Sequence, residues 1–197
     1  YRRRVIQMGE QPARVITCGA MGLEAIHRYD RIERVELGER LGTDLRDPYF
    51  LVVFHPETYS ESQDAGELLR ALSDYPDYKK VILYPNADAM SRSIIVEIED
   101  YGRREENNAF IIKSMSHAYF LSLMAQCDLM IGNSSSGLIE APSFGIPTVN
   151  IGRRQAGRIR AESVIDVDSG YAGIKRGLEK ALSAEFRQSI AGMQSPY

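Results

Sequence analysis

The stretch 127–151 constrains the fold of this chain more than any other, because it reads as a strand, a polar turn, a short helix and a second strand. Its first apolar run, 129–131, has the composition of a buried strand, and 148–151 follows Pro147 as the next strand. Between them lies a turn of small residues, 132–137. At the carboxyl end of a parallel strand, such a turn presents free backbone N–H groups and the positive end of a helix dipole. The stretch therefore predicts an anion site, typically one for phosphate.

Glu140 gives this turn a second function. It lies about one and a half helical turns beyond Ser134, so its carboxylate can stand beside a ligand bound at the helix N-terminus. A carboxylate there suits a pair of ribose hydroxyls, because its oxygens accept hydrogen bonds. Pro142 removes a backbone donor within the same helix, so we expect a short or kinked element. The alternative is a Ser- and Gly-rich helix cap beside an exposed glutamate.

The composition is that of an ordinary globular chain of one domain or one and a half, since 44% of the 197 residues are hydrophobic and 26% are charged. The net charge of −3, with acids and bases interspersed, argues against a protein that binds nucleic acid or an anionic membrane. No apolar run approaches the roughly 20 residues that span a bilayer, and nothing resembles a signal peptide. We expect a soluble protein of the cytoplasm.

Cys18 and Cys127 each stand alone beside strand-like sequence, without the paired spacing of a zinc site or a redox motif. We interpret both as reduced thiols buried in the core of a cytoplasmic protein. The chain lacks an initiator methionine and opens inside an apparent helix, so we also expect it to be a piece of something longer.

Strands and helices alternate about seven times, which predicts one doubly wound parallel sheet with helices on both faces, an α/β fold. The expected strands are 14–19, 49–54, 81–84, 110–112, 129–131, 148–151 and 164–167. The expected helices include 2–10, 33–42, 61–74, one that Asp88 caps and that ends near Tyr101, 119–124 and 171–184. The turns at 19–22, 55–58, 85–88, 132–137 and 152–158 follow strands, so we expect them to line one edge of the sheet.

Two of these turns carry side chains suited to phosphate. His55 directly follows the strand 49–54 and can donate to phosphate, although it could instead cap the next helix. The loop 152–158 holds three arginines among small residues, which suit a diphosphate or the charge of a leaving group, although a solvated basic loop would look similar. Asn86 could face the same ligand, whereas 19–22 is better explained as an ordinary strand-to-helix turn.

The stretch 132–158, which begins Gly-Asn-Ser-Ser-Ser-Gly-Leu-Ile-Glu-Ala-Pro, resembles the carboxyl-terminal half of UDP-N-acetylglucosamine 2-epimerases. Its ending Gly-Arg-Arg-Gln-Ala-Gly-Arg is closest to the hydrolysing branch, which feeds sialic and legionaminic acid synthesis. The resemblance extends from about residue 2 to 197. It implies that residues 1–197 form a single Rossmann-like, UDP-binding domain, the second half of a two-domain GT-B arrangement whose catalytic first half is missing.

The resemblance also implies roles for individual residues. It puts three serines on the diphosphate, a carboxylate on the ribose hydroxyls, an aromatic ring near the uracil, and a histidine and an arginine near the phosphates as candidate catalytic residues: Ser134, Ser135, Ser136, Glu140, Phe120, His55 and Arg158. Phe120 could instead be a core residue. The family often has Gly-Gly at 135–136, and its allosterically controlled, non-hydrolysing branch has a basic-rich segment at 55–59, so this sequence departs from that branch.

In the family's reaction, a proton leaves C2, UDP is expelled from C1, and the hydrolysing branch hydrates the glycal-like intermediate to a free N-acetylmannosamine-type sugar. The acid and base carboxylates belong to the first domain, so this chain alone should be inactive. We expect a UDP-sugar substrate, no metal and no nicotinamide cofactor, and a possible homodimer in the full-length enzyme. The alternatives are a GT-B glycosyltransferase domain and a non-catalytic nucleotide-binding module.

Overall fold

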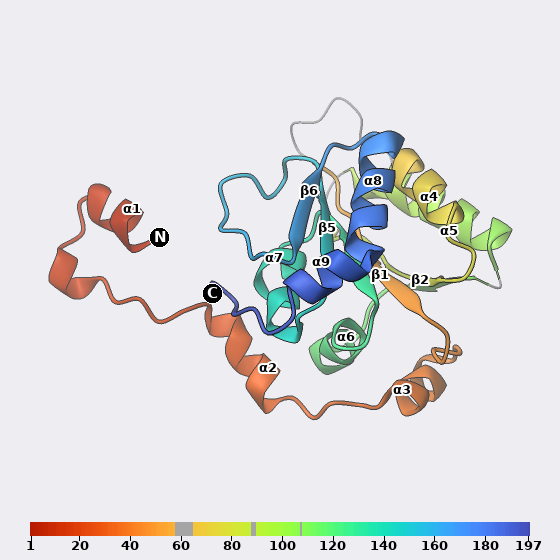
Figure 1. The fold of residues 1–197 in the computed structure, drawn as a ribbon, viewed down its shortest axis with the longest axis horizontal. Helices are drawn as coiled ribbons and strands as arrows, with labels where there is room; N and C mark the ends of the chain where they lie inside the picture. The colour runs from red at the N-terminus through yellow and green to blue at the C-terminus, as the bar shows by residue number, and fades with distance from the viewer. Residues whose placement is uncertain (58–64, 88–89, 107) are drawn as a thin grey trace.

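The structure, a computed structural model, is organised around a single parallel sheet (Figure 1). It describes residues 1–57, 65–87, 90–106 and 108–197. Within these residues the sheet has six strands in the order β3-β2-β1-β4-β5-β6, and every neighbouring pair is parallel. The strands are β1 (Tyr49–Val53), β2 (Lys79–Leu83), β3 (Ala109–Ile112), β4 (Leu129–Gly132), β5 (Thr148–Ile151) and β6 (Val164–Val167). The chain thus winds outward in one direction from β1 and in the other from β4, which is the predicted doubly wound, Rossmann-like sheet.

Helices cover both faces of this sheet (Figure 1). Those that follow β1, β2 and β6 lie on one face, whereas α3, α6, α7 and η3 belong to the other. In chain order the helices are α1 (Arg2–Gln7), η1 (Pro12–Arg14), η2 (Met21–Leu23), α2 (Glu24–Arg28), α3 (Arg34–Leu41), α4 (Gly66–Ser73), α5 (Ser91–Arg104), α6 (His117–Met124), α7 (Ser136–Ile139), η3 (Ala141–Phe144), α8 (Tyr171–Leu182) and α9 (Ala184–Ser189).

The burial of β1 explains why one apolar run can serve two cores. All five residues of this strand are buried, and successive side chains point to opposite faces of the sheet. Phe50 and Val52 join the cluster under α4, α5 and α8, whereas Leu51 and Val53 join the cluster under α3 and α6. A strand covered on both faces needs a continuous apolar sequence, as 49–53 provides.

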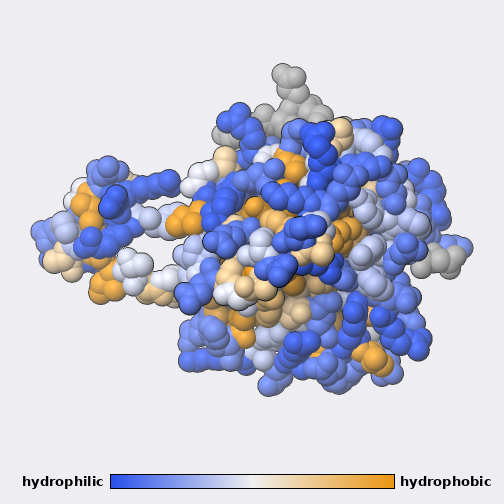
Figure 2. Space-filling view, viewed as in Figure 1, coloured by the Kyte–Doolittle hydropathy of each residue, from blue (hydrophilic) through white to orange (hydrophobic). Residues whose placement is uncertain are grey.

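The predicted strand 14–19 is wrong. Residues 12–14 form the 3-10 helix η1, and the chain from Val15 to Ala20 pairs with none of the described strands. This segment extends away from the sheet, and Figure 2 shows apolar side chains exposed on it. Ile16 is 82% exposed and Cys18 is exposed, so only Cys127 is the buried thiol that we expected. Strand-like composition gives no strand where no partner strand lies alongside.

The ligand turn predicted at 19–22 is therefore also wrong, since it follows no strand and overlaps the 3-10 helix η2. The other elements agree with the sequence within a few residues, including the helix that ends before Gly9. Pro142 does interrupt its helix, because α7 stops at Ile139 and continues only as the 3-10 helix η3. Residues 61–64 of one predicted helix, and the predicted cap Asp88, lie outside the described residues.

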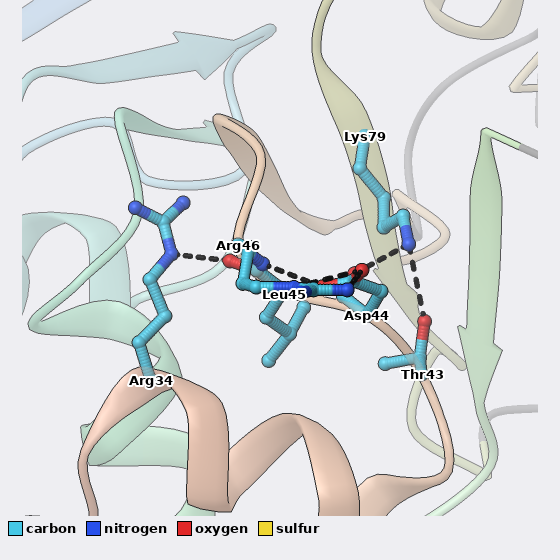
Figure 3. Close-up of polar contacts among 6 residues, drawn as sticks. All are labelled: Arg34, Thr43, Asp44, Leu45, Arg46 and Lys79. Atoms are coloured by element: carbon cyan, nitrogen blue, oxygen red, sulfur yellow. Dashed lines mark hydrogen bonds and ion pairs between the residues drawn. The ribbon is translucent and has the colours of Figure 1, made fainter.

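Polar contacts fasten α3 to the edge of the sheet where β1 and β2 begin (Figure 3). The Arg34 guanidinium donates to the carbonyls of Leu45 and Asp47, and it lies 4.8 Å from the centre of the Tyr49 ring. From the start of β2, Lys79 Nζ donates to the Asp44 carbonyl. These contacts fix the connection into β1 at the amino ends of the strands. The polar residues expected to bind a ligand lie at the opposite, carboxyl ends.

Gly132 lets β4 end directly against β1. Its φ is 139°, and a Cβ there would collide with the carbonyl oxygen of Val53. We expect Gly132→Ala to lower the free energy of unfolding by about 3 kcal/mol or more, measured by urea denaturation. Gly22→Ala is the control, because a Cβ there meets nothing within 4 Å. A Gly132→Ala protein as stable as the wild type would contradict the close approach of these strand ends.

Candidate functional site

A cavity of about 440 Å³ opens at the carboxyl ends of β1, β2 and β4. It adjoins the point between β1 and β4 at which the winding direction reverses, where open α/β sheets bind their ligands. Its lining comes from strand ends, the turns that follow them and the start of α6: Val53, His55, Leu83, Tyr84, Asn86, Met115, His117, Phe120, Ser134, Ser135, Ser136, Glu140 and Arg154.

The small-residue turn after β4 forms one wall of this cavity. Ser134, Ser135 and Ser136 all line it, and the hydroxyl oxygens of Ser134 and Ser136 lie 2.8 Å apart in a hydrogen bond. The Ser136 N–H also lies 3.4 Å from Ser134 Oγ. The Gly137 and Leu138 N–H groups donate to the Ser134 and Ser135 carbonyls, so the serine hydroxyls are the donors that this wall offers. Such a wall is suited to an anion.

Asn133 joins this turn to the end of β1. Its side chain is fully buried, its Oδ1 accepts the His55 N–H at 2.8 Å, and its Nδ2 donates to the His55 carbonyl at 2.8 Å. The His55 ring is held in turn, since its Nδ1 accepts the Asn86 N–H at 3.1 Å. Because Nδ1 accepts, the hydrogen of a neutral His55 ring sits on Nε2. Asn133 and the His55 ring together thus connect three polar segments of the cavity wall.

The loop after β5 is shaped by buried contacts. Gln155 is buried and donates through Nε2 to the Asn133 carbonyl at 2.8 Å, and Arg154 donates to the same oxygen at 3.3 Å. The Glu57 carboxylate accepts the backbone N–H groups of Arg153 and Arg154, each at 3.2 Å. The loop is therefore not merely a solvated basic segment, and it directs Arg154 into the cavity.

Arg158 is the predicted site residue that the structure does not bring into this cavity. It is exposed and lies outside the lining residues. Arg154 stands in the cavity although sequence analysis did not distinguish it from the other arginines of the loop. Sequence spacing carries no signal for this difference, because the contacts that turn Arg154 inward come from Asn133 and Glu57, which lie far away in the chain.

Glu140 and Phe120 are connected through another lining residue that sequence analysis missed, His117. Its Nε2 lies 2.9 Å from Glu140 Oε1, and its ring stacks on Phe120 with centroids 6.4 Å apart and planes 22° from parallel. His117 begins α6, just beyond the carboxyl end of β3. The sequence signal available for His117 was its position just after a strand, at the start of the helix from which Phe120 was selected.

Tyr84 also lines the cavity, at the end of β2. Burial and its hydrogen bond to the Glu99 carboxylate raise the pKa of Tyr84 to about 12, so its hydroxyl stays protonated near neutral pH.

Within the described ranges, no cluster of three or more His, Cys, Asp or Glu side chains is arranged to hold a metal ion. In the same part of the chain, no helix has the length and apolar character that crossing a membrane requires.

The family model described as UDP-N-acetylglucosamine 2-epimerase matches residues 1–197. The Polysialic acid biosynthesis protein P7 of Escherichia coli is 38% identical over an alignment of 201 positions, which covers 100% of this chain and 51% of that protein. The UDP-N,N'-diacetylbacillosamine 2-epimerase (hydrolyzing) of Legionella pneumophila is 34% identical over 186 residues, 92% of this chain and 48% of that protein.

Among solved structures, the S. aureus MnaA-UDP co-structure is similar to this chain with a TM-score of 0.74 at 12% sequence identity. The match covers 100% of this chain and 52% of that one, and at this identity it shows a shared fold. The chain thus spans about half the length of the curated relatives that it matches.

Removing the Asn133 side chain should destabilise the protein. We expect Asn133→Ala to lower the free energy of unfolding by about 3 kcal/mol, because two backbone groups of His55 lose their partners in a buried place. Asn108→Ala is the matched control, since that amide makes one hydrogen bond, to the Pro76 carbonyl, near the surface. Denaturant unfolding of both variants measures the difference, and equal small losses would contradict a special role for Asn133.

Proposed function

We propose a function for this chain from one premise: the chain belongs to the UDP-N-acetylglucosamine 2-epimerase family. In this proposal the cavity at the carboxyl edge of the sheet binds the UDP portion of a UDP-2-acetamido sugar. The supporting observation is that one cavity gathers hydroxyls, an arginine, a carboxylate and an aromatic ring. These are the groups that a diphosphate, a ribose and a flat base require.

Each group has a proposed partner on the nucleotide. The hydroxyls of the three serines and the Arg154 guanidinium bind the diphosphate, and the buried His55, which also lines the cavity, lies beside the same phosphates. Glu140 accepts hydrogen bonds from the ribose hydroxyls, and Phe120 lies against the uracil. The serine residues are Ser134, Ser135 and Ser136. The phosphate-binding and catalytic roles predicted for Arg158 stay predictions, and Arg158 lies outside this cavity.

The proposed reaction is that of the hydrolysing branch. A base removes the proton at C2, the C1–O bond breaks to release UDP, and water adds to the glycal to give a free N-acetylmannosamine-type sugar. Negative charge grows on the departing diphosphate, so donors aimed at it lower the barrier. Relatives from Legionella pneumophila and Campylobacter jejuni whose names include "hydrolyzing" support this branch.

We further propose that this chain is the nucleotide-binding domain of a two-domain enzyme. Its relatives are about twice as long, and Glu140 is the only carboxylate among the described residues that line the cavity. Since Glu140 is assigned to the ribose, the acid and base carboxylates would come from the other half. A homodimer, a cytoplasmic location and the absence of metal and nicotinamide also stay predictions.

UDP binding tests this assignment of the cavity. We expect calorimetric titration to detect binding of UDP and not of NAD, and Arg154→Ala to weaken UDP binding about tenfold or more, because it removes a charge-assisted hydrogen bond. Arg158→Ala is the matched control, since it removes the same charge outside the cavity, and we expect a change below about threefold. An Arg154→Ala protein with wild-type affinity would contradict the assignment, and a large loss in Arg158→Ala alone would favour the sequence-based one.

The reaction itself is tested in the full-length enzyme. We expect it to release UDP and a reducing sugar from a UDP-2-acetamido sugar without an acceptor, which a glycosyltransferase requires. Glu140→Ala should lower kcat/KM for the sugar nucleotide about tenfold or more, because the ribose hydroxyls lose their acceptor. Glu162→Ala, at an exposed glutamate outside the cavity, serves as the control. An unchanged kcat/KM in Glu140→Ala would refute the role of that carboxylate.

A further inference from the structure

We propose that His117 is a positioning residue that holds the Glu140 carboxylate for ribose recognition and thereby couples the ribose wall to the Phe120 wall of the cavity. The proposal rests on the proposed nucleotide-binding function and deepens it. His117 lines the cavity and contacts both Glu140 and Phe120.

His117 holds the Glu140 carboxylate through one hydrogen bond. His117 Nε2 lies 2.9 Å from Glu140 Oε1, and a carboxylate oxygen accepts, so the histidine donates through Nε2–H. Within the described residues, no other side chain is hydrogen-bonded to this carboxylate. One oxygen of Glu140 is therefore held by His117, which leaves Oε2 available to an incoming hydroxyl.

The backbone position of Glu140 does not by itself determine the direction of its carboxylate. Glu140 lies between α7 and η3 with right-handed helical torsions, φ −94° and ψ −47°, which leave the outer side-chain torsions open. Its side chain is only 16% exposed, so few solvent molecules can compete with the His117 hydrogen bond. A donor that orients the carboxylate therefore reduces the rotamer freedom that would be lost when a ligand binds.

His117 is itself held. Its ring stacks on Phe120, one turn along the same helix, with planes 22° from parallel. The N-terminus of that helix is capped, since Ser116 Oγ accepts the Tyr119 N–H at 3.3 Å. His117 remains 52% exposed, so these contacts rather than burial set its orientation. A base that stacks against Phe120 would thus lie beside the histidine that orients the ribose acceptor.

Discrimination between ribose and deoxyribose separates this positioning role from a purely structural one. We would titrate UDP and 2′-deoxyuridine diphosphate into the wild type, His117→Ala and His117→Gln. We expect the wild type to bind UDP about tenfold more tightly than the deoxy analogue, since the missing 2′-hydroxyl removes one hydrogen bond to a carboxylate. His117→Ala should reduce that preference about threefold or more. His117→Gln should keep most of it, because a glutamine amide also donates to a carboxylate.

Controls distinguish the ways in which the proposal can fail. His27→Ala removes an exposed histidine outside the cavity and should leave both affinities unchanged. If His117→Ala lowered both affinities equally and kept the preference for UDP, the positioning role would be overturned. A His117→Gln protein whose preference for UDP is as low as that of His117→Ala would overturn it as well. A wild type that binds UDP without preferring ribose would overturn the roles of both Glu140 and His117. A wild type that binds no UDP would overturn the proposed nucleotide site itself.

Discussion

The pairing of β1 with β4 is the constraint on which the rest of the structure depends. These strands come from segments far apart in the chain, and they lie side by side where the winding of the sheet reverses. Gly132 admits the close approach of the two strand ends, and Asn133 then bonds both backbone groups of His55. The cavity forms because the polar turns that follow β1 and β4 are held side by side at this junction.

From that junction the support of the cavity spreads outward through backbone groups. The Asn133 carbonyl accepts hydrogen bonds from Gln155 and Arg154, so the loop after β5 is fixed to the turn after β4. The His55 ring reaches the loop after β2 through Asn86. Buried polar groups of this kind are stabilising only when they are paired, so they favour one arrangement of the loops. The groups proposed to bind the diphosphate are consequently placed before any ligand arrives.

Most of the sheet could be predicted from sequence, because each central strand is an apolar run that needs cover on both faces. The exception, 14–19, has the same composition but no partner strand among those described, and strand propensity depends on such a partner. Every site residue that sequence selected, except Arg158, lines the cavity. Their roles in binding remain predictions. His117 and Arg154 could not be singled out, because their orientation depends on contacts with distant residues.

The sequence by itself determined the alternation of strands and helices, the small-residue turn after β4 and the family to which the chain belongs. These features are local, since they depend on periodicity, on glycine and proline, and on a long contiguous motif. The tertiary structure alone decided that Arg154 rather than Arg158 lines the cavity and that His117 holds Glu140. The physical reason is that a side chain's direction is set by the hydrogen bonds it finds across the fold, and the residues that supply them are remote in the chain.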